Sequence, residues 1–435
     1  MKSHPAGWLF FIPHFLPVLP IDKAKGAGNN RPQFPFPAKG YAMPFPVRSL
    51  TAPLLSILLL VGCGKETPGP VANSGHVPLV VKLGHAAPLT GPQAHLGKDN
   101  ENGVVLAVED VNASNIQIGG RPLKLELMSE DDQADPRQGT LVASKFVDAK
   151  VTAVIGHMNS GTTIPASKTY NDAGLPQISP SATNPMYTHQ GFKNAFRLMA
   201  NDEQQGRALG EFAAKTLKAK TVAVFDDKTA YGEGVAREFA KSALANGIQV
   251  VAEEHTDDKA MDFSAILTKA KSKKPDVIFF GGMDPQAAPM AVQLKRLGIA
   301  ATLLLADGGC TPGFISAAGN ASEGQYCSLP GVPLAQMPGG AKFDQHYKAR
   351  FNNAEIQLYA PNAYDSVMVL VEAIKRAQSI EPAKIIGELH KTNYSGVTAH
   401  VQFDENGDIK DGAISFYKVQ GGKLVFQQTL GGPAK

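Results

Sequence analysis

Residues 152–163 read TAVIGHMNSGTT, a short apolar run that passes directly into glycine, serine, threonine and asparagine. The apolar part predicts a buried strand, and the polar residues after it are typical of a loop that starts a helix. Residues 175–185, LPQISPSATNP, repeat the pattern. Buried strands that alternate with helices form parallel sheets covered on both faces, so the expected fold class is α/β.

Similar apolar runs divide the rest of the chain into two series. We predict a first series of strands at residues 79–83, 123–128, 152–155 and 175–178, and a second at 221–225, 249–253, 276–280 and 302–305. Helical patterns separate them at 98–112, 136–149, 202–217, 232–246 and 263–272. Two series imply two sheets, and therefore two doubly wound parallel-sheet lobes.

The connections predict a hinge that the chain crosses several times. Residues 192–199, FKNAFRLM, and the Pro/Gly-rich residues 329–340 are the expected crossings. Helices are expected at 341–351 and 362–377, and hairpin-like strands around the Asn-Gly turn at 406–407 and at 413–428. The boundaries that follow are 77–201 plus 331–402 for lobe 1 and 202–330 plus 403–435 for lobe 2. Such a bilobal chain can close around a ligand.

The N-terminal segment is of a different kind. The apolar run at 54–61, LLSILLLV, follows Arg48 and is too short to cross a bilayer, which favours a signal peptide. It ends in LVGC, which resembles a bacterial lipobox with Cys63 as the lipidated residue. An ordinary secretory signal is the alternative. Met43 is then a better start than Met1, residues 1–63 are an extension plus signal, and 64–76 form a tether. The expected location is the periplasm, with a membrane anchor only if Cys63 is acylated.

Composition narrows the function classes. The 435 residues are 43% hydrophobic and 19% charged, with three cysteines and a net charge of +3. This excludes wholesale disorder and a disulfide-dense scaffold, and the charge is too small for a nucleic-acid binder. Six basic residues and one acidic residue lie within 1–63, so the remainder is slightly acidic.

Enzymatic signatures are scarce in the sequence. HExxH, CxxC, GxSxG and a complete phosphate-binding loop are all absent. Residues 231–234, YGEG, begin like a dinucleotide fingerprint, but Arg237 stands where its third glycine belongs. His157 has the setting of a structural residue. We therefore expect neither an enzyme, nor a metal site, nor a cofactor.

The polar loops after the strands predict a ligand site instead. Serine and threonine hydroxyls at 160–163 and 179–183 precede or open helices, where backbone N–H groups can hold an anion. Asp307 follows a strand of the second lobe, at the same edge of the cleft. A carboxylate-binding loop opposite an acid suits a zwitterion with an ammonium group. Taken singly, each loop could equally be ordinary helix capping.

These loops resemble those of the Leu/Ile/Val-binding proteins, the substrate-binding components of branched-chain amino-acid ABC transporters with the type I periplasmic binding fold. The resemblance runs from about His85 to Gly422. It rests on the ordered motifs PLTGP (88–92), DDQADPRQ (131–138), VIGHMNSGTT (154–163), ISPSATNP (178–185), DDKTAYGEG (226–234), DFSAIL (262–267), IFFGG (278–282) and FDENGD (403–408). It implies a monomeric periplasmic protein that captures an amino acid by closure and delivers it to a permease.

The resemblance also implies roles for individual residues. Ser160 and Thr183 would bind the ligand α-carboxylate, and the carbonyl of Ser181 or Ala182 would help to hold the ammonium together with the Thr183 hydroxyl. Tyr231 would cover the ligand from the second lobe. The acid that pairs with the ammonium is usually glutamate, and the shorter Asp307 stands in its place, so the ligand must sit closer or a water must intervene.

Two departures from the family concern the ligand side chain. Met283 replaces a tyrosine and Leu96 replaces an aromatic residue. Flexible aliphatic walls predict a greasy, roomier pocket, which suits Leu, Ile or Val and leaves Phe and Met open. A different small amino acid or amide, or a sensor that presents its closed form to a signalling receptor, are the alternative functions. Once Cys63 is assigned to lipid, Cys310 and Cys327 are an even pair in an exported protein, for which a disulfide is expected.

Overall fold

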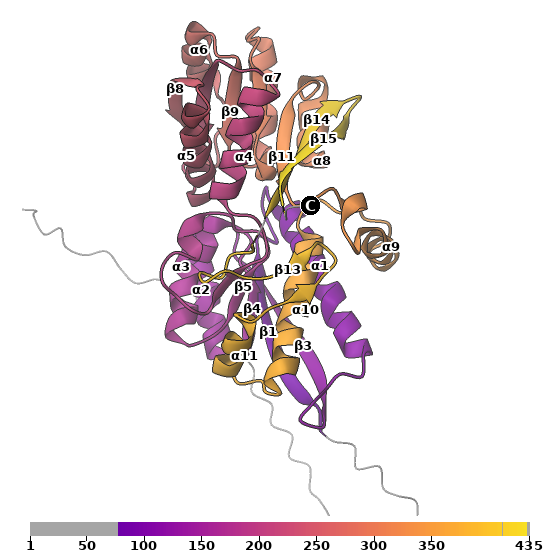
Figure 1. Cartoon of the computed structure of the whole chain (residues 1–435). Helices are drawn as coiled ribbons and strands as arrows, with labels where there is room; N and C mark the ends of the chain where they lie inside the picture. Colours follow the sequence, from indigo (N-terminus) through magenta and orange to yellow (C-terminus); the bar gives the residue numbers. More distant parts are fainter. Residues whose placement is uncertain (1–76, 411, 433–435) are drawn as a thin grey trace, which may run out of the picture. The chain divides into compact units, whose positions relative to one another are not determined.

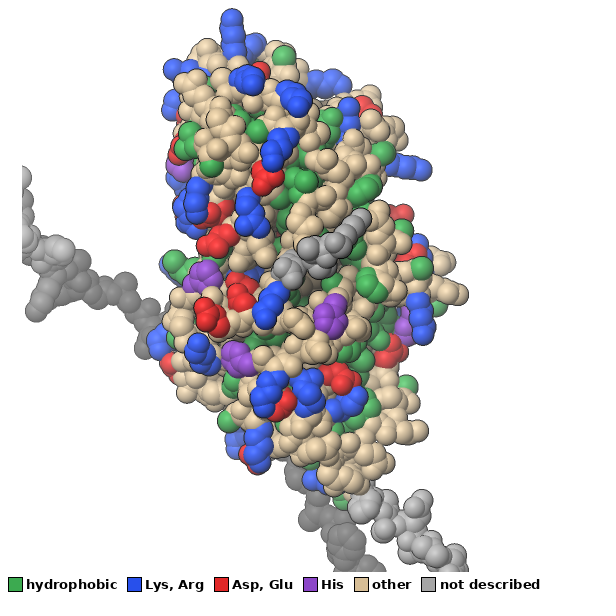
Figure 2. All heavy atoms as spheres, in the orientation of Figure 1, with side chains coloured by type: hydrophobic (Ala, Val, Ile, Leu, Met, Phe, Trp, Pro, Cys, Tyr) green, Lys and Arg blue, Asp and Glu red, His purple; other side chains and the backbone are tan. Residues whose placement is uncertain are grey.

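The computed structural model describes residues 77–410 and 412–432 (Figure 1). The predicted signal segment, the tether and Cys63 lie outside the described residues. Within those residues, no helix combines the length and the hydrophobicity that crossing a bilayer requires. The visible face carries basic and acidic side chains side by side (Figure 2).

The first lobe is built on a six-stranded sheet with the order β2-β3-β1-β4-β5-β6. Neighbouring strands from β3 to β6 are parallel, and only the edge strand β2 is antiparallel. The bounds are β1 Leu79–Ala87, β2 Gln117–Ile118, β3 Arg121–Asp131, β4 Ala153–Gly156, β5 Gln177–Ser179 and β6 Ala195–Arg197. This is the parallel arrangement that the apolar strands predict.

Helices cover both faces of this sheet. α1 Ala94–Ala113, α10 Ala360–Ala377 and α11 Pro382–Leu389 pack on one face, and α2 Pro136–Asp148 and α3 Ser160–Asp172 on the other. α9 Gly340–Arg350 packs outside α1. α10 lies beside α1 in Figure 1, so residues far apart in the sequence pack together in the first lobe.

The second lobe is built on a seven-stranded sheet with the order β15-β14-β11-β10-β9-β7-β8. The five neighbouring strands β11, β10, β9, β7 and β8 run parallel. The C-terminal hairpin β14–β15 adds an antiparallel edge next to β11. The bounds are β7 Thr221–Asp226, β8 Gln249–His255, β9 Val277–Gly281, β10 Thr302–Leu305, β11 Tyr326–Pro330, β14 Ala413–Gln420 and β15 Lys423–Gly431.

Its helices also cover two faces. α4 Asp202–Lys215 and α5 Ala230–Ala245 pack on one face, where Phe212 stacks on Phe416 and Phe239 on Phe279. α6 Ser264–Lys273, α7 Asp284–Arg296 and α8 Pro312–Ala318 pack on the other. The expected fold class, two doubly wound lobes, is confirmed.

The chain passes between the lobes at three places. The first is just before α4, where Asn201 caps the helix and forms a capping box with Gln204. The second follows β11, and the third precedes β14, where the Gly331 N–H donates to the Ala413 carbonyl at 2.7 Å. The third crossing comes later than the boundary expected between residues 402 and 403. Phe403 and Ile409 still pack in the first lobe's core, because the short strands β12 Tyr394–Ser395 and β13 His400–Val401 and the turn after them stay on that lobe.

Candidate functional site

The predicted site residues lie at the carboxyl ends of parallel strands in both lobes. Ser160 opens α3 after β4, and Ser181, Ala182 and Thr183 follow β5. Asp307 begins the short 3-10 helix η2 Asp307–Gly309 directly after β10. Ligands of open α/β sheets bind at this edge.

The loops of the first lobe hold one another by hydrogen bonds. The Ser160 hydroxyl accepts from the Asn184 N–H at 3.2 Å. The Ser181 hydroxyl donates to the Met158 carbonyl at 3.0 Å and accepts from the Asn100 amide at 3.2 Å. The Ser181 side chain therefore connects the loop after β5 to the loop after β4 and to α1. Ser160 itself sits at the N-terminus of α3, where helix N–H groups favour an anion.

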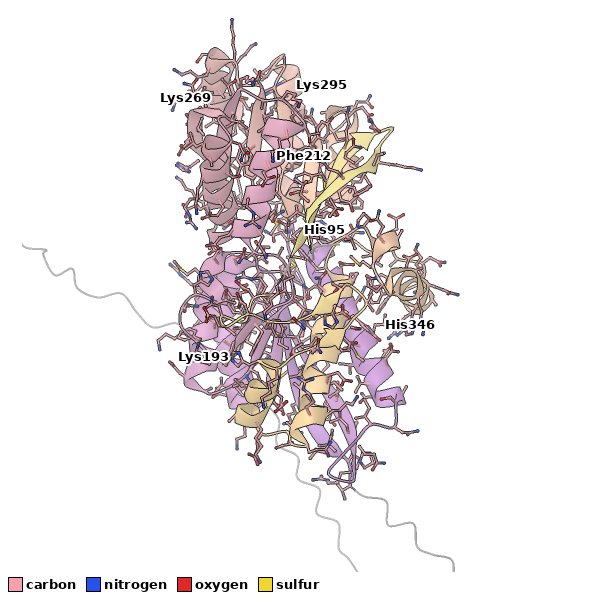
Figure 3. All side chains as sticks on the ribbon, viewed as in Figure 1. His95, Lys193, Phe212, Lys269, Lys295 and His346 are labelled. Carbon is pink, nitrogen blue, oxygen red and sulfur yellow. A yellow bond between two sulfur atoms is a disulfide. The ribbon has the colours of Figure 1, made fainter. Side chains whose placement is uncertain are left out.

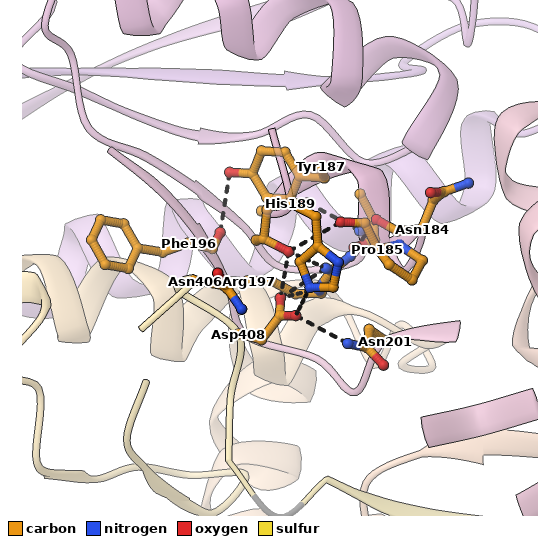
Figure 4. A network of polar contacts seen from close by, with 12 residues as sticks. Asn184, Pro185, Tyr187, His189, Phe196, Arg197, Asn201, Asn406 and Asp408 are labelled. Atoms are coloured by element: carbon orange, nitrogen blue, oxygen red, sulfur yellow. Dashed lines mark hydrogen bonds and ion pairs between the residues drawn. The ribbon is translucent and has the colours of Figure 1, made fainter. Parts of the chain in front are cut away.

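Ala182 is fixed from behind by a buried arginine. The Arg197 guanidinium donates to the carbonyls of Ala182 and Asn184 at 2.8 and 2.9 Å. Its Nε donates to Asp408 Oδ1 at 2.8 Å, and Asn201 donates to the other oxygen of Asp408 at 3.0 Å (Figure 4). Burial alone would raise the pKa of Asp408, but Arg197 holds it below its ordinary value. The Ala182 carbonyl thus already has a partner within the chain.

On the second lobe, Asp307 is buried, and two tyrosine hydroxyls donate to its carboxylate. Its Oδ1 accepts from Tyr231 at 2.8 Å and its Oδ2 from Tyr359 at 3.0 Å. Within the described residues it forms no ion pair, and burial raises its pKa. A buried carboxylate without a cation is costly, because the desolvation of the charge is not repaid inside the chain.

Tyr359, which was not predicted as a site residue, comes from the first lobe just before α10. Its position depends on Asp99 of α1, whose carboxylate accepts from the backbone N–H groups of Gln357, Leu358, Tyr359 and Ala360 at 2.7–3.0 Å. The Tyr359 hydroxyl then reaches across to Asp307. The only signal for it is the proline of residues 359–362, YAPN, which marks a helix start.

Asp202 is a second carboxylate that the sequence analysis did not place in the site. It is fully buried at the first position of α4, and neither of its oxygens has a hydrogen-bond partner among residues 77–410 and 412–432. Burial raises the pKa of Asp202 to about 8, the nearby Thr183 hydroxyl lowers it, and the charge of Asp307 raises it further. Two acids and the Thr183 hydroxyl therefore face one small region.

The expected apolar walls come together. Leu96 of α1, Tyr231 of α5 and Met283, which precedes α7, are buried in one hydrophobic cluster with Met158 and Tyr359. Gly308 lets the Asp307 loop lie against this wall. A Cβ there would meet the Met283 sulfur at 2.6 Å, which leaves no room for a side chain.

Two further contacts shape the site. The Asn184 amide donates to the Ala230 carbonyl at the start of α5, so the two lobes are in contact at the edge of the cleft. A disulfide joins Cys310, directly after η2, to Cys327 of β11, with 5.3 Å between their Cα atoms. It ties the loop that carries Asp307 to the sheet. A cavity of about 360 Å³ lies at the hinge, lined by residues of all three crossings, and contains none of the predicted site residues.

Comparisons with known proteins agree with the two-lobed α/β fold. The family model described as "Periplasmic binding protein" matches residues 80–423. A Leucine-, isoleucine-, valine-, threonine-, and alanine-binding protein of Pseudomonas aeruginosa is 34% identical over 338 residues, 78% of this chain and 89% of the relative. Leu/Ile/Val-binding protein homolog 1 of Brucella suis is 35% identical over 353 residues, 81% of this chain and 94% of the relative.

Solved structures of amino-acid-binding proteins have a fold similar to that of this chain. The leucine binding protein LivK of Thermotoga maritima has a TM-score of 0.75 at 30% identity, over 80% of this chain and 98% of its own. The branched-chain amino-acid binding protein LivJ of Streptococcus pneumoniae, in complex with isoleucine, has a TM-score of 0.74 at 27% identity, over 81% and 100%.

Proposed function

The chain belongs to the periplasmic binding protein family, and on this premise we propose that it is the extracytoplasmic solute-binding component of an ABC importer that captures an amino acid with an apolar side chain. The observation that carries the proposal is Asp307, a buried carboxylate with two tyrosine hydroxyls and no cation among the described residues. An ammonium group of a ligand would supply the missing charge.

The first lobe, across the cleft from Asp307, supplies groups for the ligand carboxylate. Ser160 and Thr183, with the N-terminus of α3, offer hydroxyl and N–H donors, as the predicted roles require. Thr183 Oγ1 has no hydrogen-bond partner in the described part of the chain, which leaves it for a ligand. The carbonyl of Ser181 and the carboxylate of Asp202 would join Asp307 around the ammonium.

The apolar wall supports an aliphatic ligand side chain. Leu96, Met158 and Met283 are hydrocarbon or thioether groups, and Tyr231 and Tyr359 turn their hydroxyls toward Asp307. Burying an aliphatic side chain there contributes about 1.5–3 kcal/mol. Relatives whose names state leucine, isoleucine and valine as ligands support the same choice.

The partners follow from the family. We propose a permease that receives the ligand from the closed protein, and binding without chemical change of the ligand, since the site pairs no nucleophile with a base. Lipid anchoring through Cys63 and a monomeric state stay predictions, as does the choice among apolar side chains.

Calorimetry against a panel of amino acids tests the proposal. The protein is first unfolded and refolded to remove ligand from the host, and leucine is then compared with 4-methylpentanoate, which lacks the ammonium, and with isoamylamine, which lacks the carboxylate. We expect binding of leucine or another apolar amino acid and none of either analogue. Equal affinity for 4-methylpentanoate would contradict the role of the acids, and no binding of any amino acid would reject the function.

A further inference from the structure

An ion pair joins the two lobes beside the apolar wall. His95, in the first turn of α1, places its Nε2 2.8 Å from Oδ2 of Asp284, the first residue of α7. Figure 3 shows His95 where the two lobes meet. His95 and Asp284 are the sequence neighbours of Leu96 and Met283, so the pair closes the cleft next to the residues that form the side-chain wall.

The acidic partner is fixed within its own lobe. Asp284 Oδ2 also accepts from the Thr311 hydroxyl at 2.7 Å, and Thr311 in turn caps α8 through the N–H of Phe314. The side chain of Asp284 is 5% exposed, and it lies at the N-terminus of α7, which favours a negative charge. The second lobe therefore holds an oriented carboxylate directed at the first lobe.

The groups that face His95 favour its protonated ring. The Asp284 carboxylate has the largest effect and raises the pKa of His95, burial opposes it, and the Pro92 carbonyl and the charge of Asp99 raise it further. A neutral imidazole donates from one nitrogen only, whereas the cation donates from both, toward Pro92 and toward Asp284. With a side chain 34% exposed, His95 can exchange protons with solvent.

We propose that His95 and Asp284 form a proton-dependent latch that holds the ligand-bound, closed arrangement of the lobes. The proposal rests on the proposed function, because closure around an amino acid is what brings the two residues together. When the lobes separate, His95 loses the carboxylate that favours its charge. Protonation of His95 and closure therefore stabilise each other.

The sign of the effect follows from the direction of the shift. The pKa of His95 is higher in the closed form, so the latch contributes fully below the ordinary histidine range. Its contribution is lost as the pH rises through the raised value of the closed form. The latch thus adds more to ligand retention in mildly acidic surroundings than in alkaline ones.

The test compares the wild type with His95→Gln and His255→Gln by calorimetry, with leucine or the amino acid that binds best in the panel, at pH 5.5, 6.5, 7.5 and 8.5. His255 is the matched control, because it pairs with Asp226 at 2.7 Å inside the second lobe and does not cross the cleft. Since Asp202 and Asp307 also titrate, the measured quantity is the ratio of the variant's Kd to that of the wild type at each pH.

We expect the His95→Gln ratio to be about two- to fivefold at pH 5.5 and to fall to about one at pH 8.5, the range of an ion pair with one partly exposed partner. The His255→Gln ratio should stay near one throughout. Asp284→Asn should show the same pH dependence as His95→Gln, and the double variant should add nothing further. A His95→Gln ratio that does not change with pH would overturn the latch and leave the proposed function intact. A wild type that binds no amino acid would reject both.

Discussion

The molecule buries acidic side chains in two regions, and it treats them differently. Behind the binding loops, Asp408 is bonded to Arg197, Thr188 and Asn201, and the guanidinium holds its pKa below the ordinary value. In the cleft, Asp307 and Asp202 form no ion pair with a basic side chain of residues 77–410 and 412–432, and burial raises the pKa of both.

We interpret this difference as one between a structural charge at Asp408 and the charge that the proposed function requires at Asp307 and Asp202. The charge of Asp408 is neutralised inside the chain, so it fixes the loop that carries Ala182 and the segment before the third crossing in one arrangement. Asp307 and Asp202 have no such partner among the described residues, so ionising either of them costs free energy in desolvation until a cation arrives. A ligand ammonium would repay that cost, which couples capture to closure.

Arg197→Met tests whether the buried Arg197–Asp408 pair stabilises the fold. It leaves Asp408 buried without a cation and takes the donor from the carbonyls of Ala182 and Asn184. We expect a loss of about 3–5 kcal/mol in the free energy of unfolding, the usual effect of removing one partner of a buried ion pair. Urea unfolding of the ligand-free protein measures it.

Arg350→Met is the matched control for that variant. Arg350 forms a bidentate pair with Glu109, but on the surface, where solvent screens both charges. It should leave the urea midpoint almost unchanged. If Arg197→Met unfolded at the same urea concentration as the control, the Arg197–Asp408 ion pair would not contribute to the stability of the fold.

Asp307→Asn tests the functional end of the comparison. The substitution keeps the shape of the side chain and removes the charge that we propose pairs with the ligand ammonium. We expect amino-acid binding to weaken by about 2–5 kcal/mol, the cost of losing one partner of a buried charge pair. Calorimetry measures it, and wild-type affinity would remove Asp307 from the site.

Asp365→Asn is the control for a buried carboxylate outside the cleft. Asp365 accepts from the backbone N–H groups of Val397 and Thr398, both at 2.8 Å, and lies in the first lobe. Its amide variant should alter stability and leave the affinity for amino acids unchanged. A loss of affinity equal to that of Asp307→Asn would mean that the effect is not specific to the cleft.

Much of the fold could be predicted because its elements carry local signals. Each predicted strand of both series is present, since apolar β-branched runs need burial on two faces. β6 was predicted only as part of a crossing, because three residues are too few to show a pattern. The late third crossing was missed because it depends on Asp408 and Arg197, which are 211 positions apart.

The site shows the same limit. The loops that carry Ser160, Thr183 and Asp307 follow strands, and parallel strands bring their carboxyl ends to one edge. Tyr359 could not be found in this way, because its place depends on Asp99 holding the start of α10. Asp202 was not predicted as a site residue, because the sequence around it correctly indicates the start of a helix. Beside Asn201 it reads as part of a helix cap, and only the packed structure shows that its carboxylate is buried without a partner.

Asp202→Asn sharpens the comparison with the smallest expected effect. The pKa of Asp202 is raised to about 8 in the folded protein, whereas an unfolded aspartate titrates near 4. Between these values the folded protein binds the extra proton, so the wild type loses stability as the pH rises from 4 to 8. The variant has no such group. It should be more stable than the wild type by about 1–3 kcal/mol at pH 8, with a smaller gain at pH 5, while binding amino acids more weakly.

Urea unfolding at both pH values, with calorimetry of leucine on the same samples, measures the two effects of Asp202→Asn. A gain in stability that grows with pH, together with lost affinity, is what a charge kept for a ligand requires. The same gain at pH 5 and pH 8 would mean that the folded and unfolded proteins release the proton of Asp202 over the same pH range, so that the pKa of Asp202 is not raised by folding. Unchanged affinity would place the acid in the packing of α4 and outside the binding machinery, and would leave Asp307 as the only acid with a functional charge.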